Sequence, residues 1–151
     1  MTKQHHHADG RPCLICTRVL SARRGENKAV VAEFAESWFV VGDHQLFPGY
    51  GLVLAKNHVR EMHDLPAPRQ RALFDELMLA TSAIARAFKP WKMNHASYGN
   101  MEPHVHWHIF PRYADDPQKE SPVWVRMNEF ARANCTPDEL AAIAQRIRAF
   151  L

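Results

Sequence analysis

The chain has 151 residues, of which 46% are hydrophobic and 23% charged, and its formal net charge is +3. This length and balance predict one globular domain with a single core. No apolar run approaches the ~20 residues that cross a bilayer, and the polar start MTKQHHHADGRP has no apolar signal core. We therefore expect a cytoplasmic protein without a membrane partner. The small positive charge suits an anionic ligand, and the absence of a basic run excludes nucleic acid as the expected partner.

Residues 1–11 are polar and predict a flexible tail ahead of a domain that spans 12–151. The tail contains three consecutive histidines, His5 to His7. Such a run is typical of a purification tag or a disordered polar tail, and we favour that interpretation over a native metal site.

Five segments have the composition of strands and two have helical periodicity. The strands are expected at 29–34, 37–41, 50–56, 93–100 (which turns at Gly99) and 104–110. Apolar residues three, four and seven apart predict a long amphipathic helix over 68–88, which Pro90 ends. The capping box TPDE opens a helix that runs to Phe150. Because only one long helix joins strands, we predict an α+β fold: a mainly antiparallel five-stranded sheet, one long helix between strands three and four, and a C-terminal helix.

The stretch EPHVHWHIFPR, residues 102–112, places His104, His106 and His108 in strict alternation. Residues two apart on a strand share a face, with about 6–7 Å between their Cα atoms. The three imidazoles therefore line one face, while Val105, Trp107 and Ile109 can pack under the helix from the other. Pro111 is expected to end the strand.

Imidazole can act as a metal ligand, a nucleophile, a general acid or base, or an anion binder. Three imidazoles along one strand could hold a polyphosphate, with one attacking phosphorus while its neighbours contact the charged oxygens. The less favoured interpretation is a solvent face that happens to use histidine. A third interpretation, a catalytic metal held by all three rings, is strained, because their Cα atoms would span about 13 Å.

At this point the chain resembles a known family. HVHWHIF (104–110) matches the signature His-x-His-x-His-x-x, with x apolar, of the histidine-triad (HIT) superfamily of nucleotide hydrolases and transferases. FPGYGLVLAKNHVREMHDL (47–65) and GNMEPHVHWH (99–108) are similar to two further stretches of that family. The resemblance covers roughly residues 13–112.

The resemblance implies a mechanism and a set of site residues. His106 would attack the α-phosphorus of a dinucleoside polyphosphate or an adenylated compound and form a covalent nucleotidyl-histidine, and a backbone carbonyl would hold its other ring nitrogen. His108 would contact the phosphate oxygens, and His104 completes the catalytic triad. The substrate-binding candidates are Asn94, Gly99, Asn100 and Asp43. Because relatives form dimers, a homodimer is also implied.

Four positions depart from the family pattern. Asn100 stands where the family has a glutamine, and Met101 replaces a serine or threonine whose hydroxyl could protonate an amine leaving group. Tyr50 replaces a histidine. The ribose-binding position falls on Gly42 by direct count, with Asp43 next to it. These departures keep open an alternative function, a regulatory HIT-like protein that binds a nucleotide without turning it over.

Cys13 and Cys16 have the spacing at which two thiolates share a tetrahedral metal ion. His58 and His104 are the best candidates for the remaining two ligands, and the resemblance supports this choice, because some members of the superfamily carry a structural zinc on such a set. Spacing alone would not select His58 over other histidines. The alternatives are unliganded thiols or a redox pair. Cys135 stands alone and is expected to be inert.

Overall fold

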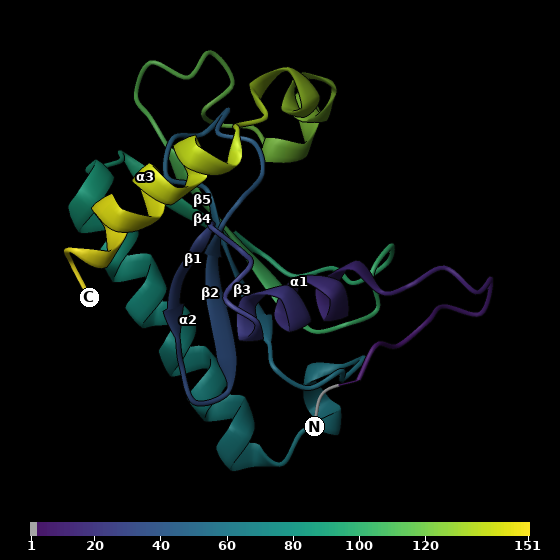
Figure 1. The fold of residues 1–151 in the computed structure, drawn as a ribbon. Helices are drawn as coiled ribbons and strands as arrows, with labels where there is room; N and C mark the ends of the chain where they lie inside the picture. The colour runs from purple at the N-terminus through teal and green to yellow at the C-terminus, as the bar shows by residue number, and fades with distance from the viewer. Residues whose placement is uncertain (1–2) are drawn as a thin grey trace.

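The computed structural model describes residues 3–151 and contains one antiparallel sheet in the order β1-β2-β3-β5-β4 (Figure 1). The strands are β1 (Val30–Glu33), β2 (Ser37–Val41), β3 (Gly51–Ala55), β4 (Lys92–Ala96) and β5 (His106–Arg112). The α-helices are α1 (Leu14–Arg23), α2 (Ala67–Phe88) and α3 (Pro137–Arg148). The 3-10 segments are η1 (Met62–Asp64) and η2 (Val123–Ala133).

The sheet is covered on both faces. Residues of α2 and α3 form a core cluster with Phe39, Val53 and Ile109 on one face. On the other face, residues of α1 and η2 pack with Val40, Leu54 and others, and Figure 1 shows α1 on the side of the sheet away from α2. Because β2 and β3 lie between these layers, every residue of both strands is buried. The helix α1 and the segment η2 therefore cover the face of the sheet that carries the imidazoles.

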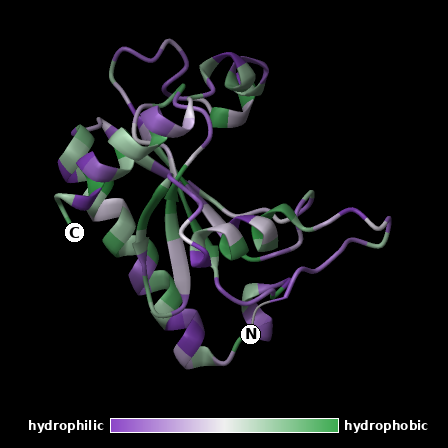
Figure 2. Cartoon of the chain, viewed as in Figure 1, coloured by the Kyte–Doolittle hydropathy of each residue, from purple (hydrophilic) through white to green (hydrophobic). Residues whose placement is uncertain are grey.

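The predicted α+β class, the five antiparallel strands and the two long helices are confirmed. Figure 2 shows hydrophilic and hydrophobic residues alternating along α2, as its periodicity predicts. The helix follows Pro66 and ends at Lys89, which has a left-handed φ of 50° before Pro90. The capping box of Thr136 and Glu139 is present at the start of α3.

Three elements were not predicted from the sequence, and two strands were placed wrongly. The unpredicted elements are α1, η1 and η2. The strand β4, expected over 93–100, ends at Ala96. The strand β5 begins at His106 rather than at residue 104, and it runs through Pro111 to Arg112. Pro111 does not end the strand because β3 pairs with β5 only as far as Ile109. Beyond this residue one edge of β5 has no partner strand, so the backbone N–H that proline lacks is not needed for a hydrogen bond on that edge.

Residues 3–11, part of the segment expected to be a tail, contact the body of the protein; residues 1 and 2 lie outside the described part of the chain. His6 and Pro12 form an isolated β-bridge, and the His5 ring stacks on His58 with 4.2 Å between the ring centroids. Within residues 3–151, no helix combines the length and the apolar character that crossing a membrane requires.

Candidate active site and metal centre

The three triad imidazoles each have a different partner. His104 directs Nδ1 toward the two N-terminal cysteines and Nε2 toward the Ala55 carbonyl at 2.9 Å. The Nδ1 of His106 lies 2.6 Å from the carbonyl of His104. The Nδ1 of His108 lies 2.8 Å from the Tyr50 hydroxyl. The rings therefore do not converge on a common point.

His106 has the arrangement that a nitrogen nucleophile needs. A carbonyl oxygen can only accept, so Nδ1 carries the proton and its N–H donates a hydrogen bond to the His104 carbonyl. Burial lowers the pKa of His106, which keeps the ring neutral near pH 7. The lone pair is consequently on Nε2, the nitrogen that remains free to react.

His106 and His108 line a cavity of about 620 Å³, and their ring centroids lie 5.0 Å apart. Asp43, Gly99 and Asn100, three of the predicted substrate-binding residues, line the same cavity. The φ of Gly99 is 71°, a left-handed value that favours glycine, and it turns the loop back toward β5. Five of the residues predicted from the sequence are thus brought together by the fold.

Two residues predicted for catalysis or substrate binding do not line this cavity. The side chain of Asn94 accepts a hydrogen bond of 2.9 Å from the buried Arg112. Arg112 also pairs with Asp116, so this contact joins β4 to the loop before η2. The ring of His104 is fully buried beside Cys13 and Cys16, and its backbone carbonyl contacts the cavity residue His106.

One cavity residue that was not predicted comes from α1. Arg18 lines the cavity and forms an ion pair with Asp43. The spacing of Ile15, Val19 and Ala22, all buried in α1, is a helical signal that could have revealed this arginine.

A second cavity residue that was not predicted comes from η2. The ring of Trp124 packs edge to face with that of His108, with 5.4 Å between the centroids. Its indole N–H donates to the Tyr98 hydroxyl at 3.1 Å. The segment η2 is interrupted at Arg126, whose backbone angles are non-helical, and it was not identified from the sequence.

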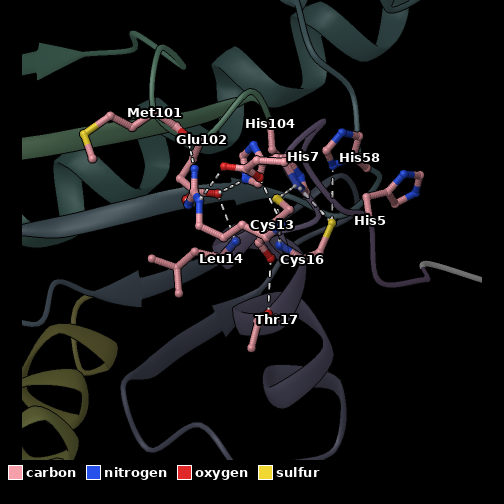
Figure 3. A network of polar contacts seen from close by, with 12 residues as sticks. His5, His7, Cys13, Leu14, Cys16, Thr17, His58, Met101, Glu102 and His104 are labelled. Carbon is pink, nitrogen blue, oxygen red and sulfur yellow. Dashed lines mark hydrogen bonds and ion pairs between the residues drawn. The ribbon is translucent and has the colours of Figure 1, made fainter.

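A second group of side chains has the arrangement of a four-ligand metal centre. Cys13, Cys16, His58 and His104 each offer one atom, and these atoms lie within 4.8 Å of one another. Figure 3 shows them converging from the start of α1, the segment after β3 and the segment before β5. Three of the S···N separations are 3.3, 3.5 and 3.6 Å. A tetrahedral zinc ion with ordinary bond lengths needs about 3.6 Å between sulfur and nitrogen ligands.

The protonation states of this group also suit a cation. Burial lowers the pKa of His104 to about 4 and also lowers that of His58, so both rings are neutral near pH 7. The contact of His104 Nε2 with the Ala55 carbonyl places the proton there and leaves a lone pair on Nδ1. Burial raises the pKa of Cys16 to about 11, so its thiolate requires a nearby positive charge.

Glu102 ties the N-terminal segment to the loop before β5. Its carboxylate accepts from the backbone N–H of Leu14 at 2.9 Å and lies 3.1 Å from the His7 ring (Figure 3). It also forms an ion pair with Arg11. The hydrogen bonds from Leu14, Arg11 and His7 outweigh the effect of burial and lower the pKa of Glu102. These contacts hold the C-terminal end of the loop that contains Gly99 and Asn100 against the N-terminal segment.

The HIT domain family model matches residues 23–115, which is more than half of the chain, so the chain belongs to the HIT domain family. No curated protein sequence matches it. The fold is similar to that of a histidine triad protein from Sinorhizobium meliloti 1021, with a TM-score of 0.71 and 21% identity over 86% of this chain and 94% of that one.

Two further solved structures share the fold. A zinc-bound histidine triad family protein from Mycobacterium smegmatis has a TM-score of 0.65 and 17% identity over 91% of each chain. Diadenosine triphosphate hydrolase from Plasmodium falciparum has a TM-score of 0.59 and 18% identity, over 82% of this chain and 76% of that one. At these identities the likeness establishes the fold.

The half-buried, neutral state of His108 predicts an acid-dependent loss of stability. Burial lowers the pKa of His108 from 6.5 to about 3. Since the unfolded chain binds this proton more readily, the contribution of His108 to stability is complete above pH 6.5 and is lost as the pH falls toward 3. The difference in free energy of unfolding between the wild type and His108→Asn should therefore shrink between pH 7 and pH 4.

Urea unfolding at several pH values, with a chelator present for both proteins, measures this difference. His63→Asn is the matched control, because the His63 side chain is 83% exposed. A gap between wild type and His108→Asn that stays constant with pH contradicts the assignment.

Proposed function

We propose that the protein is a nucleotide hydrolase or nucleotidyl transferase that acts at the α-phosphate of a nucleotide conjugate through a covalent nucleotidyl-histidine on His106. The observation that carries this proposal is the hydrogen bond from His106 Nδ1 to the His104 carbonyl, at a residue that lines the cavity. A neutral imidazole held in this tautomer is an effective nucleophile near pH 7. Membership of the HIT domain family supports the same chemistry.

In the first step, the Nε2 lone pair of His106 attacks the α-phosphorus and the bond to the leaving group breaks, so the leaving group departs with the bonding electrons. His108 contacts the phosphate oxygens. In the second step, water or another hydroxyl acceptor attacks phosphorus and releases a proton to solvent. The P–N bond breaks and its electrons return to Nε2, which restores neutral His106. Met101 has no hydroxyl to protonate an amine, so a phosphate or carboxylate leaving group, which needs no proton, fits best.

Dinucleoside polyphosphates and adenylated small molecules are the substrate classes that we propose. The Plasmodium falciparum relative in fold is a diadenosine triphosphate hydrolase, which supports the first class. Leu14, Ile15, Leu52 and Trp124 give the cavity an apolar wall suited to a nucleobase. A catalytic metal held by the triad is disfavoured, because the three rings engage three separate partners.

Replacement of His106 by Ala tests the proposal. The variant should lose turnover of a dinucleoside polyphosphate by about 10³-fold or more, because no other described side chain offers a free imidazole nitrogen at the same place. The measurement is nucleotide release followed by chromatography, with circular dichroism to confirm the fold.

His63→Ala, an exposed histidine outside the cavity, is the control and should retain wild-type turnover. Full activity of His106→Ala contradicts the mechanism. Tight nucleotide binding by the wild type with no product after long incubation would instead favour the non-catalytic, regulatory alternative.

We also propose that Cys13, Cys16, His58 and His104 hold a structural zinc ion. Four protein ligands would leave no open position for substrate. The ion would add positive charge that keeps the thiols deprotonated, while these residues join the start of α1 to the segment before β5. The zinc-bound relative in fold from Mycobacterium smegmatis supports the choice of metal.

Substitution of one ligand tests the zinc site. Cys16→Ser should reduce the zinc content from about one ion per chain to near zero and lower the melting temperature. Cys135→Ser, which changes a cysteine outside the cluster, should affect neither. Both variants keep His5 to His7, so metal on that run cancels in the comparison made by mass spectrometry of the metal. Equal zinc content in Cys16→Ser and wild type contradicts the site.

We propose a homodimer on the strength of the family resemblance. The strand β4 lies at an edge of the sheet, and Phe74 and Leu79 on α2 are 51% and 55% exposed, which supports association through this region. Sedimentation of the 17.4 kDa chain should give twice that mass; a monomer at tens of micromolar contradicts the proposal.

A further inference from the structure

Tyr50 contacts His108 and packs against two further aromatic rings. Its ring stacks on His44, at 4.6 Å, and on Phe110, at 4.3 Å between centroids. The side chain is 5% exposed, and its hydroxyl lies 2.8 Å from His108 Nδ1. A phenol in this setting has almost no freedom to turn elsewhere, so its contact with the imidazole is a fixed part of the site.

The direction of this hydrogen bond follows from the partners available. Within residues 3–151, His108 Nδ1 is the partner of the Tyr50 hydroxyl, and a buried O–H needs an acceptor. Burial raises the pKa of Tyr50 above its ordinary value of 10, so the phenol keeps its proton. The hydroxyl therefore donates to Nδ1. A neutral His108 that accepts at Nδ1 must carry its own proton on Nε2.

Gly42 makes room for this tyrosine. A Cβ atom built on Gly42 would lie 2.1 Å from Cε1 and 2.2 Å from Cδ1 of Tyr50, far inside van der Waals contact. The backbone cannot easily move away, because the Gly42 N–H donates to the Tyr50 carbonyl at 2.9 Å. Gly42 and Tyr50 therefore form a matched pair, and a side chain at residue 42 would displace the phenol.

We propose that Tyr50 is a positioning residue that fixes His108 as the tautomer protonated on Nε2, and that Gly42 supplies the space this requires. His108 then presents a neutral N–H donor to the phosphate oxygens, while His106 presents a lone pair from the opposite tautomer. A donor oriented before the substrate arrives needs no reorganisation during the reaction. The consequence for catalysis rests on the proposed function; the tautomer is a property of the free protein.

Nuclear magnetic resonance of the full chain with ¹⁵N-labelled histidine reads the tautomer directly. The His108 signals are assigned by their loss in His108→Asn. In the wild type, the proton should reside on Nε2 alone. In Tyr50→Phe, which keeps the ring but removes the donor, His108 should become a mixture of both tautomers, and kcat should fall about tenfold with little change in KM.

Tyr113→Phe is the matched control. It removes another phenol hydroxyl, one that donates to the Pro48 carbonyl at 2.6 Å outside the cavity, and it should leave the His108 tautomer and kcat unchanged. A wild-type His108 protonated on Nδ1, or a Tyr50→Phe spectrum identical to that of the wild type, overturns the proposal whatever the turnover. If the tautomer shifts but kcat does not, the catalytic part is overturned. Activity retained by His106→Ala would contradict the proposed function but would not affect the conclusion about the His108 tautomer.

A double-mutant cycle tests the pairing of Gly42 with Tyr50. Gly42→Ala should destabilise the wild type, because the new methyl group meets the phenol ring. The same change should cost little in a Tyr50→Ala background, where the ring is absent. Equal losses of unfolding free energy in both backgrounds would show that residue 42 does not act through Tyr50.

Discussion

The residue His104 joins the two halves of the site, and the remaining arrangement depends on its fixed position. Its ring lies among the two cysteines and His58, its Nε2 contacts the Ala55 carbonyl of β3, and its own carbonyl accepts from His106. One residue thus connects the proposed metal centre to the proposed nucleophile. Because the ring is fully buried, movement of the backbone at residue 104 would disturb both at once.

The two imidazoles that line the cavity are held in opposite tautomers, because the partner of one ring is a hydrogen-bond acceptor and the partner of the other is a donor. The Nδ1–H of His106 donates a hydrogen bond to a backbone carbonyl, and in the proposed arrangement the Tyr50 hydroxyl donates one to Nδ1 of His108. Burial keeps both rings neutral, since it lowers the pKa of each. The cavity consequently has one nitrogen that can attack phosphorus beside one that can donate to its oxygens, without either ring needing a charge.

Sequence periodicity predicted the sheet, the two long helices and the face that carries the histidines, because these patterns depend on local geometry. It placed both the start and the end of β5 two residues early, because the pairing of β5 with β3 and with β4 sets those limits. The helix α1 and the segment η2 were missed, and with them Arg18 and Trp124. The Tyr50–His108 contact and the space at Gly42 depend on three segments meeting in the fold, which no spacing along the chain reveals.

The most direct test of the central claim is a search for the covalent intermediate. The wild-type chain is mixed with a limiting amount of a diadenosine polyphosphate, quenched in alkali within the first turnover, digested and analysed by mass spectrometry. We expect one nucleoside monophosphate on the peptide that contains His106, appearing before product and then decaying. Turnover without such an adduct, or an adduct on a different residue, contradicts the account.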